Sequence, residues 1–163
     1  ESSAASDVYK RQESVKRPVT DIDYGFAGDI TQVNTAVFAS LTAQNFVPVL
    51  CAITHDNNGQ LLNTNADTIA AQVAKAMSEE FDVTLFYCFE HAGVLKDINK
   101  PENVISKLSK EAAETYTKAG VIHQGMVPKL HNGFDALENG VKEVVVSNIA
   151  GLLDINAPKT TLI

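Results

Sequence analysis

The sequence predicts an α/β fold, a three-layer αβα sandwich with a largely parallel central sheet. Short apolar runs rich in β-branched residues alternate along the chain with longer segments whose apolar residues recur every three or four positions. Strands separated by helices are typical of βαβ crossovers, which place helices on both faces of a parallel sheet. The chain has 163 residues, 45% of them hydrophobic, and is long enough to bury one sizeable core.

These two patterns also predict the individual elements. The apolar runs predict strands at residues 19–23, 29–33, 46–53, 83–88 and 143–147. The helical periodicity predicts helices at residues 35–44, 66–78, 109–118, 128–139 and 148–154. The polar run 55–60 predicts a tight turn between two short strands, and residues 99–103 around Pro101 predict an internal loop.

Two amides and a carboxylate stand at one of the predicted strand-to-helix junctions: Asn63, Asn65 and Asp67. Asn65 is a good N-cap, and Asp67 falls in the first helical turn, where the helix dipole favours an anion. Ligands of α/β sheets bind beyond the carboxyl ends of the strands, where this junction lies. The motif therefore predicts either a ligand site or an ordinary helix cap.

Lys129 stands where the helix dipole opposes it. Gly125 precedes a helix that begins near Pro128, so Lys129 falls in the first turn, at a cost of roughly 0.3–1 kcal/mol. An anion would offset this cost. Free backbone N–H groups, a nearby glycine and a lysine together predict a phosphate site without a Walker motif. The alternative is a lysine that simply extends into solvent.

Composition excludes several classes of function. The net charge of −7 argues against a nucleic-acid partner, since phosphate backbones require clustered Lys and Arg. The longest apolar run, 46–53, is too short to span a bilayer, so we expect no membrane partner. We expect buried thiols at Cys51 and Cys88, and the four histidines have no metal-ligand spacing: His55, His91, His123 and His131.

Two long motifs, residues 59–67 (GQLLNTNAD) and 119–129 (AGVIHQGMVPK), resemble the amino acid kinase family, most closely its kinases for N-acetylglutamate. Residues 23–29 (DYGFAGD) are similar to the family's hairpin before a Val-Asn helix start, here Val33-Asn34. The resemblance implies that residues 15–163 are the C-terminal, ATP-binding part of such a domain, truncated at its N-terminus. Residues 1–14 are expected to be an extraneous leader, because residues 1–12 have no place in the family pattern.

The resemblance also implies an activity: ATP-dependent phosphorylation of the γ-carboxylate of N-acetyl-L-glutamate, a cytoplasmic step of arginine biosynthesis. Lys129 would stabilise the transferring phosphoryl group, and Asp67 would hold the catalytic lysines in place. Asn63 and Asn65 would bind the acylated amino acid. Mg²⁺ would bind through the ATP phosphates rather than through a carboxylate cluster. The nucleotide would be lined by Glu90, Gly93, Val94, Leu95, Val121, Ile122, His123 and Gly125.

Some alternatives remain open. Relatives typically have Thr-Asp where this chain has Phe89-Glu90, so the fit around the ribose must differ. The substrate could be another N-acylglutamate, such as N-succinylglutamate, or the chain could belong to another amino acid kinase. A different class is a non-catalytic nucleotide- or amino-acid-binding regulatory module. We expect the chain as given to be inactive, and a homo-oligomer of the full-length enzyme is left open.

Overall fold

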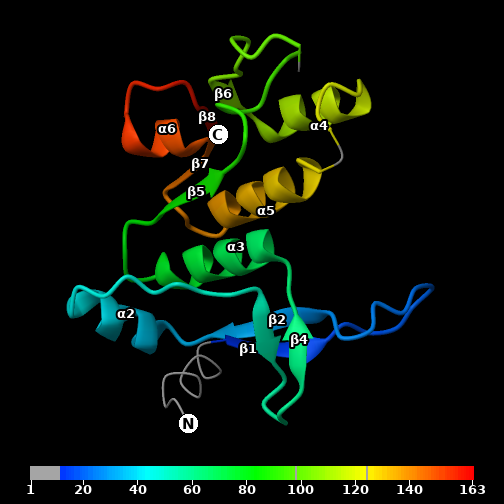
Figure 1. Cartoon of the computed structure of the whole chain (residues 1–163), viewed down its shortest axis with the longest axis vertical. Helices are drawn as coiled ribbons and strands as arrows, with labels where there is room; N and C mark the ends of the chain where they lie inside the picture. The colour runs from blue at the N-terminus through cyan, green and yellow to red at the C-terminus, as the bar shows by residue number, and fades with distance from the viewer. Residues whose placement is uncertain (1–11, 98, 124) are drawn as a thin grey trace. The chain divides into compact units, whose positions relative to one another are not determined.

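The computed structural model describes residues 12–97, 99–123 and 125–163, without the side chain of Gln12. The chain divides into two compact units, Glu1–Ala76 (unit 1) and Met77–Ile163 (unit 2). Each unit contains one four-stranded sheet and helices (Figure 1). The predicted α/β class is confirmed.

Unit 1 has a mixed sheet in the order β2-β1-β3-β4. Strand β1 lies antiparallel to β2 and parallel to β3, and β3 and β4 form an antiparallel hairpin around the predicted turn. Leu62 of β4 is fully buried, and helix α3 buries one face that contains Ile69. The elements of unit 1 are β1 (Gln12–Lys16), β2 (Gly28–Val33), α2 (Thr35–Ala43), β3 (Ile53–His55), β4 (Leu61–Asn63) and α3 (Ala66–Met77).

An ion pair closes the β1–β2 hairpin. Arg17 Nη2 lies 2.5 Å from Asp29 Oδ1, and Arg17 Nε donates to both carboxylate oxygens at 3.1 Å. The guanidinium also lies 5.3 Å from the ring centroid of Tyr24. The hydrogen bond from Arg17 lowers the pKa of Asp29, and the same bond raises the pKa of Arg17.

Unit 2 has a second mixed sheet, in the order β5-β7-β8-β6. The pairs β5–β7 and β6–β8 are parallel, and β7–β8 is antiparallel. Its core includes Val144 and Val146 of β7 and Leu108 of β6, all fully buried. The elements are β5 (Thr84–Cys88), β6 (Lys107–Leu108), α4 (Lys110–Lys118), α5 (Val127–Glu138), β7 (Glu143–Ser147), α6 (Ile149–Leu153) and β8 (Thr160–Leu162).

Helices α5 and α6 cover opposite faces of the unit 2 sheet (Figure 1). A methyl group added at Gly133 of α5 would meet Val144 of β7, whereas one added at Gly151 of α6 would meet Ser147. Val144 and Ser147 are three residues apart on one strand, and side chains at such a spacing point to opposite faces. Unit 2 therefore has the three layers that the sequence predicts.

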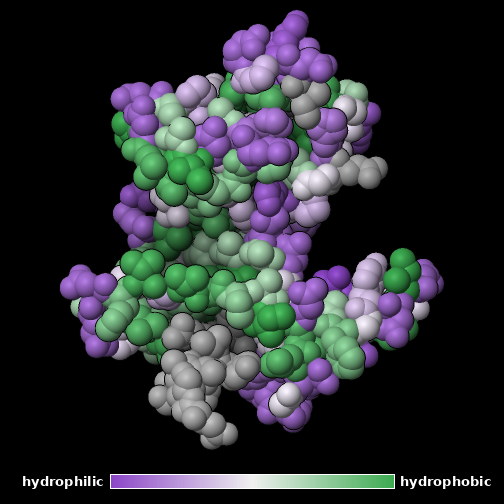
Figure 2. Space-filling view, in the orientation of Figure 1, coloured by the Kyte–Doolittle hydropathy of each residue, from purple (hydrophilic) through white to green (hydrophobic). Residues whose placement is uncertain are grey.

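The predicted helices are found with ends that differ by one residue at most, but two predicted strands are wrong. Residues 19–23 lie in the β1–β2 connection, and of residues 46–53 only Ile53 belongs to a strand. In the second run Val47 and Val49 are each 85% exposed, and Figure 2 shows hydrophobic surface on this part of unit 1. Apolar composition did not make these runs strands, because a strand also needs a neighbour for its backbone hydrogen bonds, and Pro48 has no N–H to donate.

Three strands have no counterpart in the sequence prediction: β1, β6 and β8. Strand β1 includes Gln12, Glu13 and Ser14, which fall inside the segment 1–14 that we expected to be a leader. Residues 1–11 lie outside the described part of the chain. The sheets also contain more antiparallel pairing than a largely parallel sheet implies, because β1–β2 and β3–β4 are hairpins and hairpins pair antiparallel.

Candidate functional site

The Asn63–Asp67 motif lies where β4 ends and α3 begins, as predicted. The Asn65 side-chain oxygen accepts from the backbone N–H of Asp67 at 2.9 Å and of Thr68 at 3.1 Å. Asn65 is therefore a helix N-cap, which satisfies donors that the first turn leaves without an intrahelical partner. Because its oxygen is occupied, the part of Asn65 left for a ligand is its amide NH₂ group.

Thr64 fixes the residues on either side of it, a role that its sequence pattern does not indicate. Its buried Oγ1 lies 2.8 Å from Thr54 Oγ1 of β3 and 3.2 Å from the carbonyl oxygen of Gly28. A side chain at Gly28 would collide with Leu62 Cβ, 2.7 Å from the added methyl group. Strands β2, β3 and β4 thus hold Thr64 inside unit 1 while its neighbours Asn63 and Asn65 are exposed.

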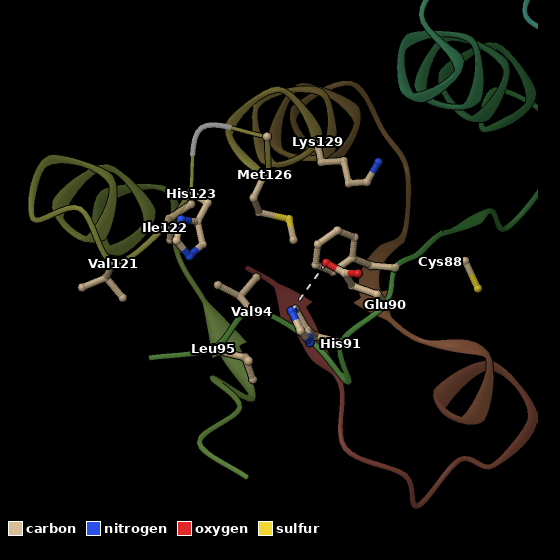
Figure 3. Close-up of a pocket in the computed structure, with 13 residues that line it drawn as sticks. Cys88, Glu90, His91, Val94, Leu95, Val121, Ile122, His123, Met126 and Lys129 are labelled. Atoms are coloured by element: carbon tan, nitrogen blue, oxygen red, sulfur yellow. Dashed lines mark ion pairs between the residues drawn. The ribbon is translucent and has the colours of Figure 1, made fainter. Parts of the chain in front are cut away.

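Unit 2 contains a pocket of about 460 Å³ at the ends of β5 and α5 (Figure 3). All eight residues predicted to line the nucleotide line this pocket, and so does Lys129. The other residues that line it are Cys88, Phe89, His91 and Met126. The structure therefore brings together two segments, 88–95 and 121–129, that are distant in sequence. Gln124 of the second segment lies outside the described residues.

Lys129 lies in the first turn of α5, as the sequence predicts. Its ammonium lies 5.6 Å from the ring centroid of Tyr87, a residue of β5 that is 4% exposed. A cation over an aromatic face is attracted by the ring quadrupole, so Tyr87 helps to hold Lys129 in place. The N-cap of α5 is Met126, whose thioether points into the pocket and makes no cap hydrogen bond (Figure 3). The positive end of the helix and the lysine charge thus meet at one rim of the pocket.

The opposite wall of the pocket is the segment from Phe89 to Leu95. Glu90 is mostly exposed, and its Oε1 lies 3.7 Å from His91 Nε2. The His91 ring packs edge-to-face against Phe89, with 5.4 Å between the ring centroids. Val94 is buried and projects toward the pocket between these polar residues and Leu95 (Figure 3). The wall therefore offers apolar surface with one exposed carboxylate.

Both thiols are exposed, so the prediction that Cys51 and Cys88 are buried is wrong. Cys51 precedes β3 in the exposed run, and Cys88 is the last residue of β5. In the described parts of the chain, no three His, Cys, Asp or Glu side chains are grouped so that they could hold a metal ion. None of the helices described is long and apolar enough to cross a membrane.

The model of the amino acid kinase family matches residues 4–148. The chain belongs to the amino acid kinase family. It is 50% identical to the acetylglutamate kinase of Bacteroides thetaiotaomicron over 141 residues, which are 86% of this chain and 55% of that protein. It is 51% identical to the acetylglutamate kinase of Phocaeicola vulgatus over 134 residues, 82% of this chain and 52% of that protein. The chain thus spans about half the length of these relatives.

Solved structures share the fold of this amino acid kinase chain. The protein smu.665 from Streptococcus mutans aligns with a TM-score of 0.76 at 24% identity, over 96% of this chain and 58% of that one. N-acetylglutamate synthase from Neisseria gonorrhoeae, solved with coenzyme A and L-arginine, gives the same TM-score at 20% identity. This alignment covers 93% of this chain and 36% of that one. The family resemblance carried by the two sequence motifs is confirmed.

Proposed function

We propose that this chain is the C-terminal, ATP-binding part of an acetylglutamate kinase. The full enzyme would transfer the γ-phosphoryl group of ATP to the γ-carboxylate of N-acetyl-L-glutamate, a cytoplasmic step of arginine biosynthesis. The observation that carries the proposal is the pocket in unit 2, which is lined by Lys129 and by every residue expected around the nucleotide. The identity of about 50% to kinases of this name supports the choice of substrate.

The pocket has one apolar end and one cationic end, as a nucleotide requires. The base would lie against the apolar side chains and the phosphates would point to the N-terminus of α5, where backbone N–H groups and the dipole favour an anion. Glu90 would accept hydrogen bonds from ribose hydroxyls. The apolar lining consists of Phe89, Val94, Leu95, Val121, Ile122 and Met126.

Phosphoryl transfer of this kind needs positioning and charge neutralisation more than covalent chemistry. The attacking γ-carboxylate is already ionised, so no general base is required. Lys129 would stabilise the charge on the phosphoryl group in flight. Mg²⁺ would bind through the ATP phosphates, because this ion keeps several waters and is commonly held by substrate phosphates.

Unit 1 would supply the groups for the acylated amino acid. Asn63 is exposed at the end of β4, and Asn65 has its amide NH₂ group to donate beside it. Asp67 would position the catalytic lysines rather than act as a base. The part of the enzyme that would bind the acyl group is not identified in this chain, so N-succinylglutamate is the alternative substrate.

The nucleotide assignment is tested by titrating ATP into the isotope-labelled 163-residue chain and recording backbone amide signals. We expect the amides of Gly93, Ile122 and Gly125 to shift in parallel and to saturate, while that of Leu62 in unit 1 stays in place. The chain should bind weakly, because it carries one side of the phosphate site. An absence of shifts at these pocket amides, or shifts confined to unit 1, would refute the assignment.

A further inference from the structure

Two buried hydroxyl groups hold the pocket wall from behind. Thr160 lies on β8 and Ser147 ends β7, and both side chains are 0% exposed. Both bond to the backbone of the segment that contains Ala92, Gly93 and Val94. That segment is far from either residue in sequence and forms part of the lining of the pocket.

Thr160 bonds directly to the residue that projects into the pocket. The backbone N–H of Val94 donates to Thr160 Oγ1 at 2.8 Å, and the carbonyl oxygen of Val94 accepts from the N–H of Ile105 at 2.8 Å. The backbone of Val94 is therefore fixed on both sides, although its segment has no helix or regular strand. These two backbone hydrogen bonds therefore also fix the position of the Val94 side chain.

Gly93 makes this close approach possible. A methyl group added at Gly93 would lie 2.6 Å from Thr160 Oγ1 and 2.7 Å from Val104 Cγ1. Its φ of +153° is also a conformation that other residues rarely adopt. Gly93, predicted to line the nucleotide, thus also allows the wall to rest on β8.

Ser147 supports the same segment at Ala92, two residues before Val94. Its hydroxyl oxygen lies 3.1 Å from the carbonyl oxygen of Ala92 and 3.0 Å from that of Pro158, and its single proton is shared between these two acceptors. A methyl group at Gly151 of α6 would lie only 2.1 Å from Ser147 Oγ, so the helix is packed directly on this hydroxyl. The wall is therefore bonded to β7 through Ala92 and to β8 through Val94.

We propose that Thr160 is a positioning residue for the nucleotide: its hydroxyl fixes Val94 and thereby sets the shape of the wall against which the base would lie. This role rests on the proposed function, because its effect is on ATP affinity. Replacing Thr160 by the isosteric valine removes the acceptor and leaves the N–H of Val94 buried without its partner. The segment must then move toward water to satisfy that N–H, and the wall moves with it.

The test compares Thr160→Val, Thr160→Ser and Thr161→Val in the 163-residue chain, with ATP affinity and hydrogen exchange at the Val94 amide as readouts. Thr161 is the matched control, because adjacent strand residues point to opposite faces. We expect Thr160→Val to weaken ATP binding about tenfold and to speed exchange of the Val94 amide. Thr160→Ser keeps the hydroxyl and should remain within about twofold of the unmodified chain, as should Thr161→Val.

Each outcome decides a different point. Unchanged affinity in Thr160→Val, or fast exchange at Val94 in the unmodified chain, overturns the positioning role alone. Failure of the unmodified chain to bind ATP overturns the proposed function, and the positioning role falls with it. If Thr160→Val does not fold, Thr160→Ser still decides, since a tenfold loss of affinity in that variant would show that the hydroxyl is not what matters.

Discussion

Lys129 is the residue on which the proposed chemistry depends most. Its ammonium lies over Tyr87 at the rim of the pocket, in the helix turn where a cation is least favoured. A lysine without an anionic partner would destabilise the helix at this position through its unfavourable interaction with the dipole. When the nucleotide is bound, the attraction between the lysine ammonium and the phosphates would offset that unfavourable interaction.

In the full-length protein, Lys129→Ala should lower kcat on the order of 10²-fold or more and change the KM for ATP much less. The reason is that its charge matters most in the transition state. Lys129→Arg should not restore the rate fully, because a planar fork replaces a point charge. Steady-state kinetics measure both effects, with Lys142→Ala as the control, since Lys142 pairs with Asp82 on the surface. An unchanged kcat at a normal melting temperature would mean that Lys129 is an ordinary surface lysine with no role in catalysis.

The Asn63–Asp67 motif allows capping and catalysis to be separated. Asn63→Ala should raise the KM for the acylated amino acid, whereas Asp67→Asn should lower kcat, because the proposed role of Asp67 in positioning the catalytic lysines requires its negative charge. The control is Ser109→Ala, which removes the side-chain cap of another helix, α4, and should cost about 0.5–2 kcal/mol of stability without changing kcat or KM. If Asn63→Ala and Asp67→Asn only lower the melting temperature and leave the kinetics alone, the motif is structural.

At the level of elements, the sequence predicted what local patterns encode. The helices were predictable because their apolar periodicity and caps are local, and β5 and β7 because they are apolar runs that pair in parallel. Strands β1 and β8 were not predicted, since their residues are largely polar and form no apolar run. The hydrogen bond between Thr160 and Val94 joins residues 66 positions apart, so no local sequence pattern predicts it. The pocket residues came from the family resemblance rather than from spacing.

The β1–β2 hairpin gives a pH-dependent prediction. The pKa of Asp29 is lowered in the folded chain by Arg17, so the pair stabilises the fold above the unfolded pKa of about 3.9. This stabilisation is lost as the pH falls through the lower folded value. Asp29→Asn should therefore cost about 0.2–1 kcal/mol at pH 7 and progressively less below pH ~4.

Urea unfolding of both proteins at pH 7 and pH ~3 measures this difference. Added salt of about 1 M should shrink the difference at pH 7, because the pair is partly exposed and salt screens it. A difference that is independent of pH would mean that Asp29 contributes through packing rather than charge.

At the level of the whole molecule, the chain spans about half the length of its kinase relatives. Transition-state stabilisation needs donors around the whole phosphoryl group, and the described pocket offers one lysine and one helix end. The 163-residue chain alone should therefore bind ATP weakly and show no kinase activity. Turnover of N-acetylglutamate by this chain above a Lys129→Ala control would contradict that expectation.

The measurement that tests the central claim most directly is the ATP-dependent phosphorylation of a series of acylglutamates by the full-length protein, with hydroxylamine to trap the acyl phosphate. The claim predicts hydroxamate formation from N-acetyl-L-glutamate with equal release of ADP, and a lower kcat/KM for N-succinyl-L-glutamate and for free glutamate. A higher kcat/KM for the succinyl compound would correct the acyl group and leave the chemistry intact. ATP binding without any acyl phosphate from these substrates would contradict the claim and indicate a regulatory module.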